Sequence, residues 1–265
     1  MAQFSAIVCL PPQARSNVDV ALESALAPYR IAEGPEETWM LDDWWIRESD
    51  HSGLPVLAGH DSDPRLVHRT TRWDGSPLPP PLPGRCGGGP RELIDFATPL
   101  AEAERNAEAS WSILAELAAA HPPAEPLSAF EARSLADPDG YPYARCLADY
   151  QAQPFVRAHA ELQGRFAVPF SQSADPFIWV EDPVLQLAGG QAAYLSKSTV
   201  HIIVTEALLT LDGRWLDQDG GSGYAEAPPP PDPKLSWRDL YAIEATDYLL
   251  GVPGDTLLIS IGCHC

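Results

Sequence analysis

The 265-residue chain is 45% hydrophobic and 20% charged, and these ordinary globular proportions exclude a wholly disordered chain, a coiled coil and a collagen-like repeat. Its 17 basic residues face 37 acidic ones, and the resulting net charge of −20 disfavours nonspecific binding to nucleic acids or anionic membranes. No apolar run approaches the roughly 18 residues of a membrane span, and residues 1–12 lack the pattern of a secretory signal. We therefore expect a soluble, cytoplasmic protein.

The first 48 residues predict a strand, a helix and a second strand. Residues 4–10 form a short apolar run, partly β-branched and stopped by two prolines, which is typical of a buried strand. Ser16 or Asn17 can cap a following helix that ends before Pro28. The aromatic-rich residues 38–46 predict the second strand.

The middle of the chain predicts a long loop followed by helices. Residues 50–90 show no sustained period and include a proline-rich stretch, which indicates an extended loop. A helix is predicted over residues 91–120 with a break near Pro99, and a weaker helix over residues 143–160. The pattern of residues 191–204 is compatible with either a helix or a strand.

The last third predicts a hairpin, a helix and a strand. Within residues 207–216, apolar residues stand on both sides of an Asp-Gly pair, which indicates two strands joined by a turn. After a Gly/Pro-rich linker, Ser236 and Asp239 form a capping-box variant at the start of the final helix. The apolar residues 256–261 predict the closing strand.

This order of elements predicts an α+β fold, in which the terminal strands share one sheet. Strand, helix and strand, then an insertion, then strands, helix and strand is the order of a two-layer sandwich of the ferredoxin-like type. We expect a single domain over residues 1–265. Its core would come from residues 1–48 and 191–265, with a long loop and helical insertion over residues 49–190.

Four landmarks along the chain resemble a group of uncharacterised actinobacterial and actinophage proteins. They are an early Trp pair (Asp43, Trp44, Trp45), an Arg-Cys-Gly-Gly element at residues 85–88, a late Asp-Gly-Arg-Trp at residues 212–215, and a strand ending in Cys263 and His264. The group usually has a Gly-Gly-Arg-Trp element after the Trp pair, for which residues 71–73 are the only match, and an acidic residue where Gly262 stands. The resemblance implies an accessory protein associated with a phage or mobile element and supplies no mechanism.

The glycine-rich segment before the central helix is a candidate anion site. Consecutive backbone amides at Gly87, Gly88 and Gly89 can form a nest for a phosphate or carboxylate, with Arg85 and Arg91 beside it. The alternative is a flexible connector, which we favour because an isolated glycine-rich loop is weak evidence for a ligand.

The tryptophans Trp39, Trp44 and Trp45 are candidate interface residues, since aromatic side chains carry much of the binding energy at protein interfaces. Adjacent residues of a strand point to opposite faces, so Trp44 and Trp45 cannot both lie in one core. Core packing of at least one tryptophan is the simpler interpretation.

The terminal Cys263, His264 and Cys265 allow a metal hypothesis, with Cys86, His60 or His68 as a fourth ligand. Their spacing is not that of a common zinc module, so we predict no metal or other cofactor and favour buried free thiols. All five cysteines are expected to be reduced.

These observations lead to three hypotheses about function. The first is a soluble acidic accessory protein that acts by binding another protein, with no nucleic-acid or membrane partner and an open oligomeric state. The second is an enzyme that acts on an anionic small molecule through the Arg/Gly-rich segment and the Cys/His residues. The third is an acidic inhibitor that mimics nucleic acid. Convergence of Arg85, Cys86, Arg91 and His264 in one cleft would favour the second over the first.

Overall fold

The computed structural model describes residues 3–31, 41–47, 53–69, 76–77, 82–162, 182–219 and 236–264. The chain divides into two compact units, the first formed by residues 1–101 and 200–265 and the second by residues 102–199. The first unit contains a β-sheet with its helices: β1 (Gln3–Leu10), η1 (Pro12–Ser16), α1 (Val18–Leu26), η2 (Ala27–Tyr29), β2 (Asp43–Ile46), β3 (Leu54–Pro55), β4 (Arg85–Cys86), β5 (Gly88–Pro90), η4 (Arg91–Leu93), β6 (Ala207–Leu209), β7 (Trp215–Asp217), α7 (Trp237–Gly251) and β8 (Leu257–His264).

The main sheet has the strand order β2-β8-β1-β6-β7, and β5 also pairs with β8. β1 and β8 are antiparallel neighbours along their whole length, from Gln3 opposite His264 to Leu10 opposite Leu257. The prediction that the two terminal strands lie buried in one sheet is therefore confirmed. β3 and β4 form a separate two-stranded ladder in the stretch that the sequence predicted as loop.

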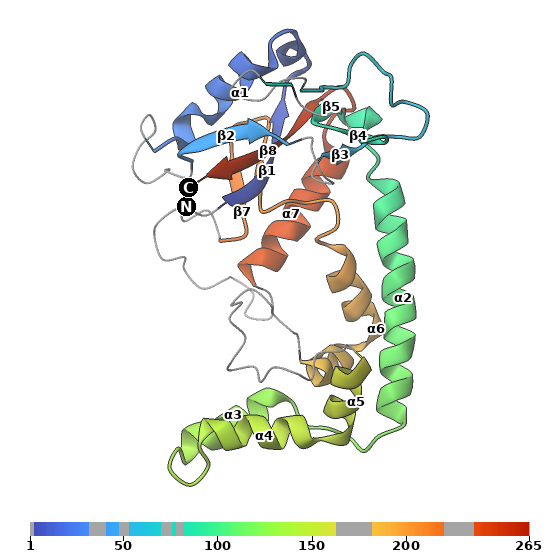
Figure 1. The fold of residues 1–265 in the computed structure, drawn as a ribbon, viewed down its shortest axis with the longest axis vertical. Helices are drawn as coiled ribbons and strands as arrows, with labels where there is room; N and C mark the ends of the chain where they lie inside the picture. Colours follow the sequence, from blue (N-terminus) through green and yellow to red (C-terminus); the bar gives the residue numbers. More distant parts are fainter. Residues whose placement is uncertain are drawn as a thin grey trace. The chain divides into compact units, whose positions relative to one another are not determined.

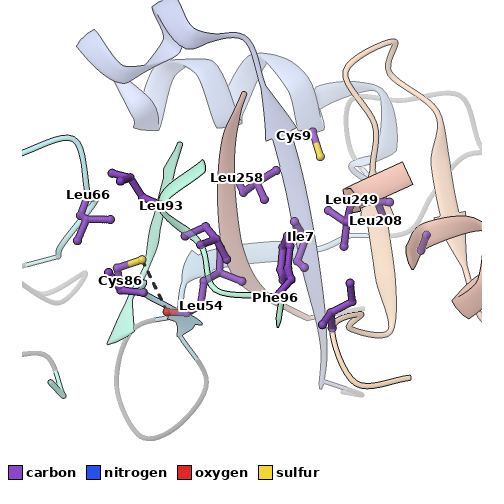
Figure 2. Close-up of a cluster of buried hydrophobic side chains, with 14 of the residues drawn as sticks. Ile7, Cys9, Leu54, Leu66, Cys86, Leu93, Phe96, Leu208, Leu249 and Leu258 are labelled. Atoms are coloured by element: carbon purple, nitrogen blue, oxygen red, sulfur yellow. Dashed lines mark hydrogen bonds between the residues drawn. The ribbon is translucent and has the colours of Figure 1, made fainter. Parts of the chain in front are cut away.

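The sheet carries a helix on each face (Figure 1). Alternate residues of β1, such as Val8, point toward α1 and pack with its buried Leu22 and Leu26. Their neighbours, such as Ile7, point the other way and pack with Leu249 of α7. Ile7, Leu208, Leu249 and Leu258 gather in this second cluster (Figure 2).

The fold is α+β, as predicted, but its details differ from the expected two-layer, ferredoxin-like core. A two-layer sandwich would place both helices on one face, whereas α1 and α7 lie on opposite faces. A ferredoxin-like core has a split βαβ unit, with a strand inserted between the two parallel ones. Here β1, α1 and β2 do form such a split unit, because β8 lies between β1 and β2 and is antiparallel to both. The inserted strand is, however, the last strand of the chain, and β6 pairs in parallel with the other edge of β1, with Ala6 opposite Ala207. The ferredoxin-like topology is therefore not confirmed.

Local capping signals identified the helices of the first unit well. The Asn17 side chain accepts a hydrogen bond from the Val20 amide at the start of α1. Ser236 and Asp239 form the reciprocal capping box of α7. The Asp-Gly turn between β6 and β7 has Gly213 at φ +82°, a conformation that glycine adopts without strain.

The second unit is helical and has its own small core. Its helices are the body of α2 (Ala97–Ala119), α3 (Leu127–Ala136), α4 (Tyr143–Ala152), α5 (Pro154–Leu162) and α6 (Pro183–Thr199). The core gathers Leu114, Phe130, Tyr150 and Phe155. Residues 191–199, left open between helix and strand by the sequence, are the end of α6.

Candidate functional site

The glycines of the predicted anion nest belong to the sheet. The Gly87 amide donates to the Val67 carbonyl, and the Gly87 and Gly88 carbonyls accept from the Ser260 and Val67 amides. Gly88 and Gly89 lie opposite residues of β8 in register. A Cβ at Gly88 would lie 2.5 Å from the Leu258 carbonyl oxygen, so glycine allows β5 to approach β8 closely. The Gly87 amide is therefore already used within the fold.

The two arginines of this segment bond to different parts of the fold. Arg85 donates from Nη1 to the Gly53 carbonyl at 2.9 Å. Arg91 donates to the Leu249 and Leu250 carbonyls, at 3.1 and 3.2 Å, at the end of α7. A cation beside the last carbonyls of a helix stabilises them and complements the helix dipole. Both side chains thus satisfy backbone carbonyls.

The structure does not bring Arg85, Cys86, Arg91 and His264 together. Cys86 is fully buried, with its Sγ 3.7 Å from the Leu54 carbonyl oxygen (Figure 2). Gly88, two residues after Cys86, pairs with Ile259, whereas His264 lies five residues further along β8, about 17 Å at the rise of a strand. The convergence that would favour the enzyme hypothesis is absent among these described side chains.

The metal hypothesis gains no support from the terminal residues. Cys263 is fully buried in the core on the α1 face. His264 is the last described residue, and Cys265 lies outside the described part of the chain. Among the described residues, no three His, Cys, Asp or Glu side chains form a group that could hold a metal ion.

The tryptophan pair lies on β2, at one end of the strand order. Trp44 and Trp45 are both half-buried and occupy opposite faces of the sheet, while Trp39 lies outside the described residues. Trp44 packs against the core cluster that includes Cys263, its partner in register. Trp44 is therefore the packed member of the pair.

Trp45 lies on the other face, over Gly262 and beside His264. The indole and imidazole centroids are 4.8 Å apart, with their planes at 52°. A Cβ at Gly262 would lie 2.4 Å from Cζ2 of Trp45, so the absence of a side chain lets the indole lie on the backbone of β8. Nε2 of His264 is 2.9 Å from Nε2 of Gln3, which pairs with it in register. We call Gln3, Trp45, Gly262 and His264 the Trp45 patch.

A serine and a carboxylate adjoin the Trp45 patch. Ser5 lies opposite Gly262 and is 6% exposed, and both its amide and its hydroxyl donate to Oε2 of Glu206. Burial, with Glu206 nearby, raises the pKa of Tyr241 on α7. The sequence analysis missed Gln3, Ser5 and Glu206, because only the register of β1 with β8 and β6 places them in the row that runs from Trp45 through Gly262 across the sheet.

This end of β2 also carries exposed negative charge and a strand edge. Asp42 and Asp43 are exposed at the start of the strand, and the Asp42 amide donates to the His264 carbonyl. Within the described part of the chain, β8 is the only strand that pairs with β2. An edge strand offers its outer N–H and C=O groups to an additional strand. Aromatic, polar and acidic side chains here surround an edge that can pair.

No protein-family model, curated protein or solved structure matches this chain. Of the helices that the structure describes, none combines the length and apolar character needed to cross a membrane.

Proposed function

We propose that this protein is an accessory protein that acts by binding another protein, and that the partner docks along β2 beside the Trp45 patch. The observation that carries the proposal is the position of β2 at the end of the sheet, with Trp45 half-buried next to it. In strand addition, backbone hydrogen bonds supply affinity and side chains on alternate positions supply specificity. The association of this accessory protein with a phage or mobile element is the part of the proposal that rests on the resemblance of the four landmarks to actinobacterial and actinophage proteins.

The charge of this region indicates the chemistry of the partner. Asp42 and Asp43 are exposed beside the strand, and the whole chain carries a net charge of −20. Opposite charge accelerates encounter and suppresses wrong partners. The proposed partner therefore contributes an extended segment that carries lysine or arginine residues.

The register identifies the amides that such a segment would use. The Arg47 amide donates to the Ser260 carbonyl, and hydrogen-bonded pairs alternate along an antiparallel ladder. The inward-facing amides of β2 are therefore those of Asp43 and Trp45, and the outward-facing ones those of Trp44 and Ile46. Strand addition requires the outward-facing amides.

The test begins with capture of the partner in the natural host by proximity labelling from the full chain, followed by titration calorimetry with the purified partner. We expect Asp42→Lys with Asp43→Lys to weaken binding at least tenfold, and Trp45→Ala to weaken it comparably. The matched control is Glu104→Lys with Glu108→Lys, which makes the same charge change at exposed positions of α2. The control should leave affinity within twofold.

Hydrogen exchange in the complex gives an independent measurement. Strand addition should slow exchange at the Trp44 and Ile46 amides by at least tenfold when the partner is bound. Unchanged affinity of both β2 variants, or protection confined to other elements, would show that the partner binds elsewhere.

A further inference from the structure

A pocket of about 390 Å³ lies at the opposite end of β1 from the Trp45 patch. It is lined by η1, which follows β1 directly, and by residues next to the start of β8. Leu10, Leu257 and Pro90 are successive neighbours in register on β1, β8 and β5, so three strand ends meet here. The volume falls in the range of small-molecule sites.

Two oppositely charged side chains line this pocket. Arg15 belongs to η1 and Asp255 precedes β8, and both are exposed. Among the described residues, neither has a hydrogen-bond or ion-pair partner, and the two are not bridged to each other. Each therefore retains its full capacity to bind a group of opposite charge.

A second arginine in the pocket differs, because acidic neighbours already compensate it. Arg65 donates from Nε and Nη2 to the Asp63 carboxylate at 3.1 and 3.0 Å, and from Nη1 to Glu92 at 2.5 Å. These hydrogen bonds lower the pKa of Asp63 to about 2. The charge of Arg65 is thus already neutralised by Asp63 and Glu92. The charges in the pocket that no ion pair with a described residue neutralises are the positive charge of Arg15 and the negative charge of Asp255.

The remaining lining is apolar and supplied by Pro12, Pro90 and Leu257. A guanidinium binds a carboxylate well, often through two hydrogen bonds, and a carboxylate binds an ammonium group. A ligand that carries both groups is electrically neutral, so the net charge of −20 does not oppose its approach as it opposes that of an anion.

We propose that the pocket binds a small zwitterion, an amino carboxylate in which Arg15 takes the carboxylate and Asp255 the ammonium group. The apolar spacer of the ligand lies on Leu257 and the two prolines. This site is independent of β2 and of the proposed protein partner.

The experiment titrates the full chain with straight-chain ω-amino acids from glycine to 6-aminohexanoate, by calorimetry and by thermal shift. We expect saturable binding that peaks at one chain length, since only one spacer fits the separation of the two charges. Acetylation of the amine or amidation of the carboxylate of that best ligand should weaken binding at least tenfold.

Two variants assign the ends of the ligand. In Arg15→Gln, the best ligand and its amide should bind equally, while acetylation still weakens binding. In Asp255→Asn, the acetylated form of the best ligand should bind with the same affinity as the unmodified ligand, while amidation still weakens binding. The control Arg238→Gln, at an exposed position of α7, should bind each of these ligands with the affinity of the unmodified protein.

Three outcomes would overturn the proposal. They are no saturable binding of any member at millimolar concentration, equal binding of the blocked forms to the unmodified protein, or equal binding of propionate or propylamine. Because the urea midpoint of each variant is measured in parallel, a loss of binding through unfolding is distinguished from a loss of contact.

Discussion

The two halves of β8 show how one strand serves two different purposes. Its first half, residues 257–259, pairs with β5, which contributes Gly88 and Gly89, and its side chains lie in the apolar clusters on both faces of the sheet. Its second half, residues 261–264, pairs with β2, where Gly262 supports Trp45 and His264 lies at the surface beside Gln3. Glycine allows close approach in both halves, to backbone in the first and to an indole in the second. The same residue type thus builds the core at one end and shapes a candidate binding surface at the other.

The largest expected difference between the halves comes from Gly88→Ala. The new Cβ would meet the Leu258 carbonyl and the Ile259 side chain within 2.5 Å, and the backbone of a central strand cannot move aside cheaply. We expect a loss of about 3 kcal/mol in the free energy of unfolding, measured by urea denaturation. Gly251→Ala, where nothing lies within 4 Å, should change it by less than about 0.5 kcal/mol. A mild Gly88→Ala would mean that β5 does not approach β8 this closely.

Gly262→Ala should cost less, about 1–2 kcal/mol, because a side chain rather than backbone is in the way. Displacement of the indole should also change the tryptophan fluorescence. In a Trp45→Ala background the same substitution should cost less than about 0.5 kcal/mol, since the clash is gone. Strictly additive effects in this double-mutant cycle would argue against the contact between the two residues.

Arg91→Met tests whether the segment that pairs with the first half of β8 has a structural role or binds an anion. Loss of the hydrogen bonds to the Leu249 and Leu250 carbonyls should lower the free energy of unfolding by about 1 kcal/mol. Phosphate at millimolar concentration should not stabilise the unmodified protein through this segment. Stabilisation by phosphate that disappears in Arg91→Met would instead restore the anion-nest hypothesis. Arg238→Met, at an exposed position, is the matched control.

The smallest effect concerns Cys9, which pairs with Leu258 in the first half. Burial raises the pKa of its thiol from 9.0 to about 12, so the folded protein keeps the proton when the unfolded chain has lost it. The stability that the protonated, buried thiol allows is fully present below pH 9, and the free energy of unfolding declines as the pH rises from 9 toward 12. When the pH is raised from 8 to 10, the free energy of unfolding of Cys9→Ala should therefore fall by about 1 kcal/mol less than that of the unmodified protein. Parallel pH profiles would contradict the burial of this thiol.

Local signals in the sequence predicted most elements of the first unit. The apolar terminal strands, the Asn17 cap, the capping box at Ser236 and the Asp-Gly turn before Trp215 depend on residues close in sequence. Strands β3, β4 and β5 were missed because two or three residues with glycine and proline show no strand period. Their conformation depends on partners far along the chain.

The candidate site was predicted only in part. The alternation of a strand placed Trp44 and Trp45 on opposite faces, and the structure agrees. Nothing local indicated that Gln3 would contact His264 or that Ser5 would bond to Glu206, because this follows from the register of β1 with β8 and β6. The same register separates His264 from the arginines beside β5.

The sequence by itself determined where the chain forms strands and capped helices, since backbone geometry and capping are properties of neighbouring residues. Tertiary structure alone decided that Gly88 packs against β8, that Arg91 bonds to a carbonyl in the last turn of α7, and that Arg15 and Asp255 line one pocket. These roles depend on residues that are far apart in the sequence, such as Arg15 and Asp255, which are 240 positions apart and line one pocket, and no local pattern encodes them. Pairing of the first strand with the last is what brings them together.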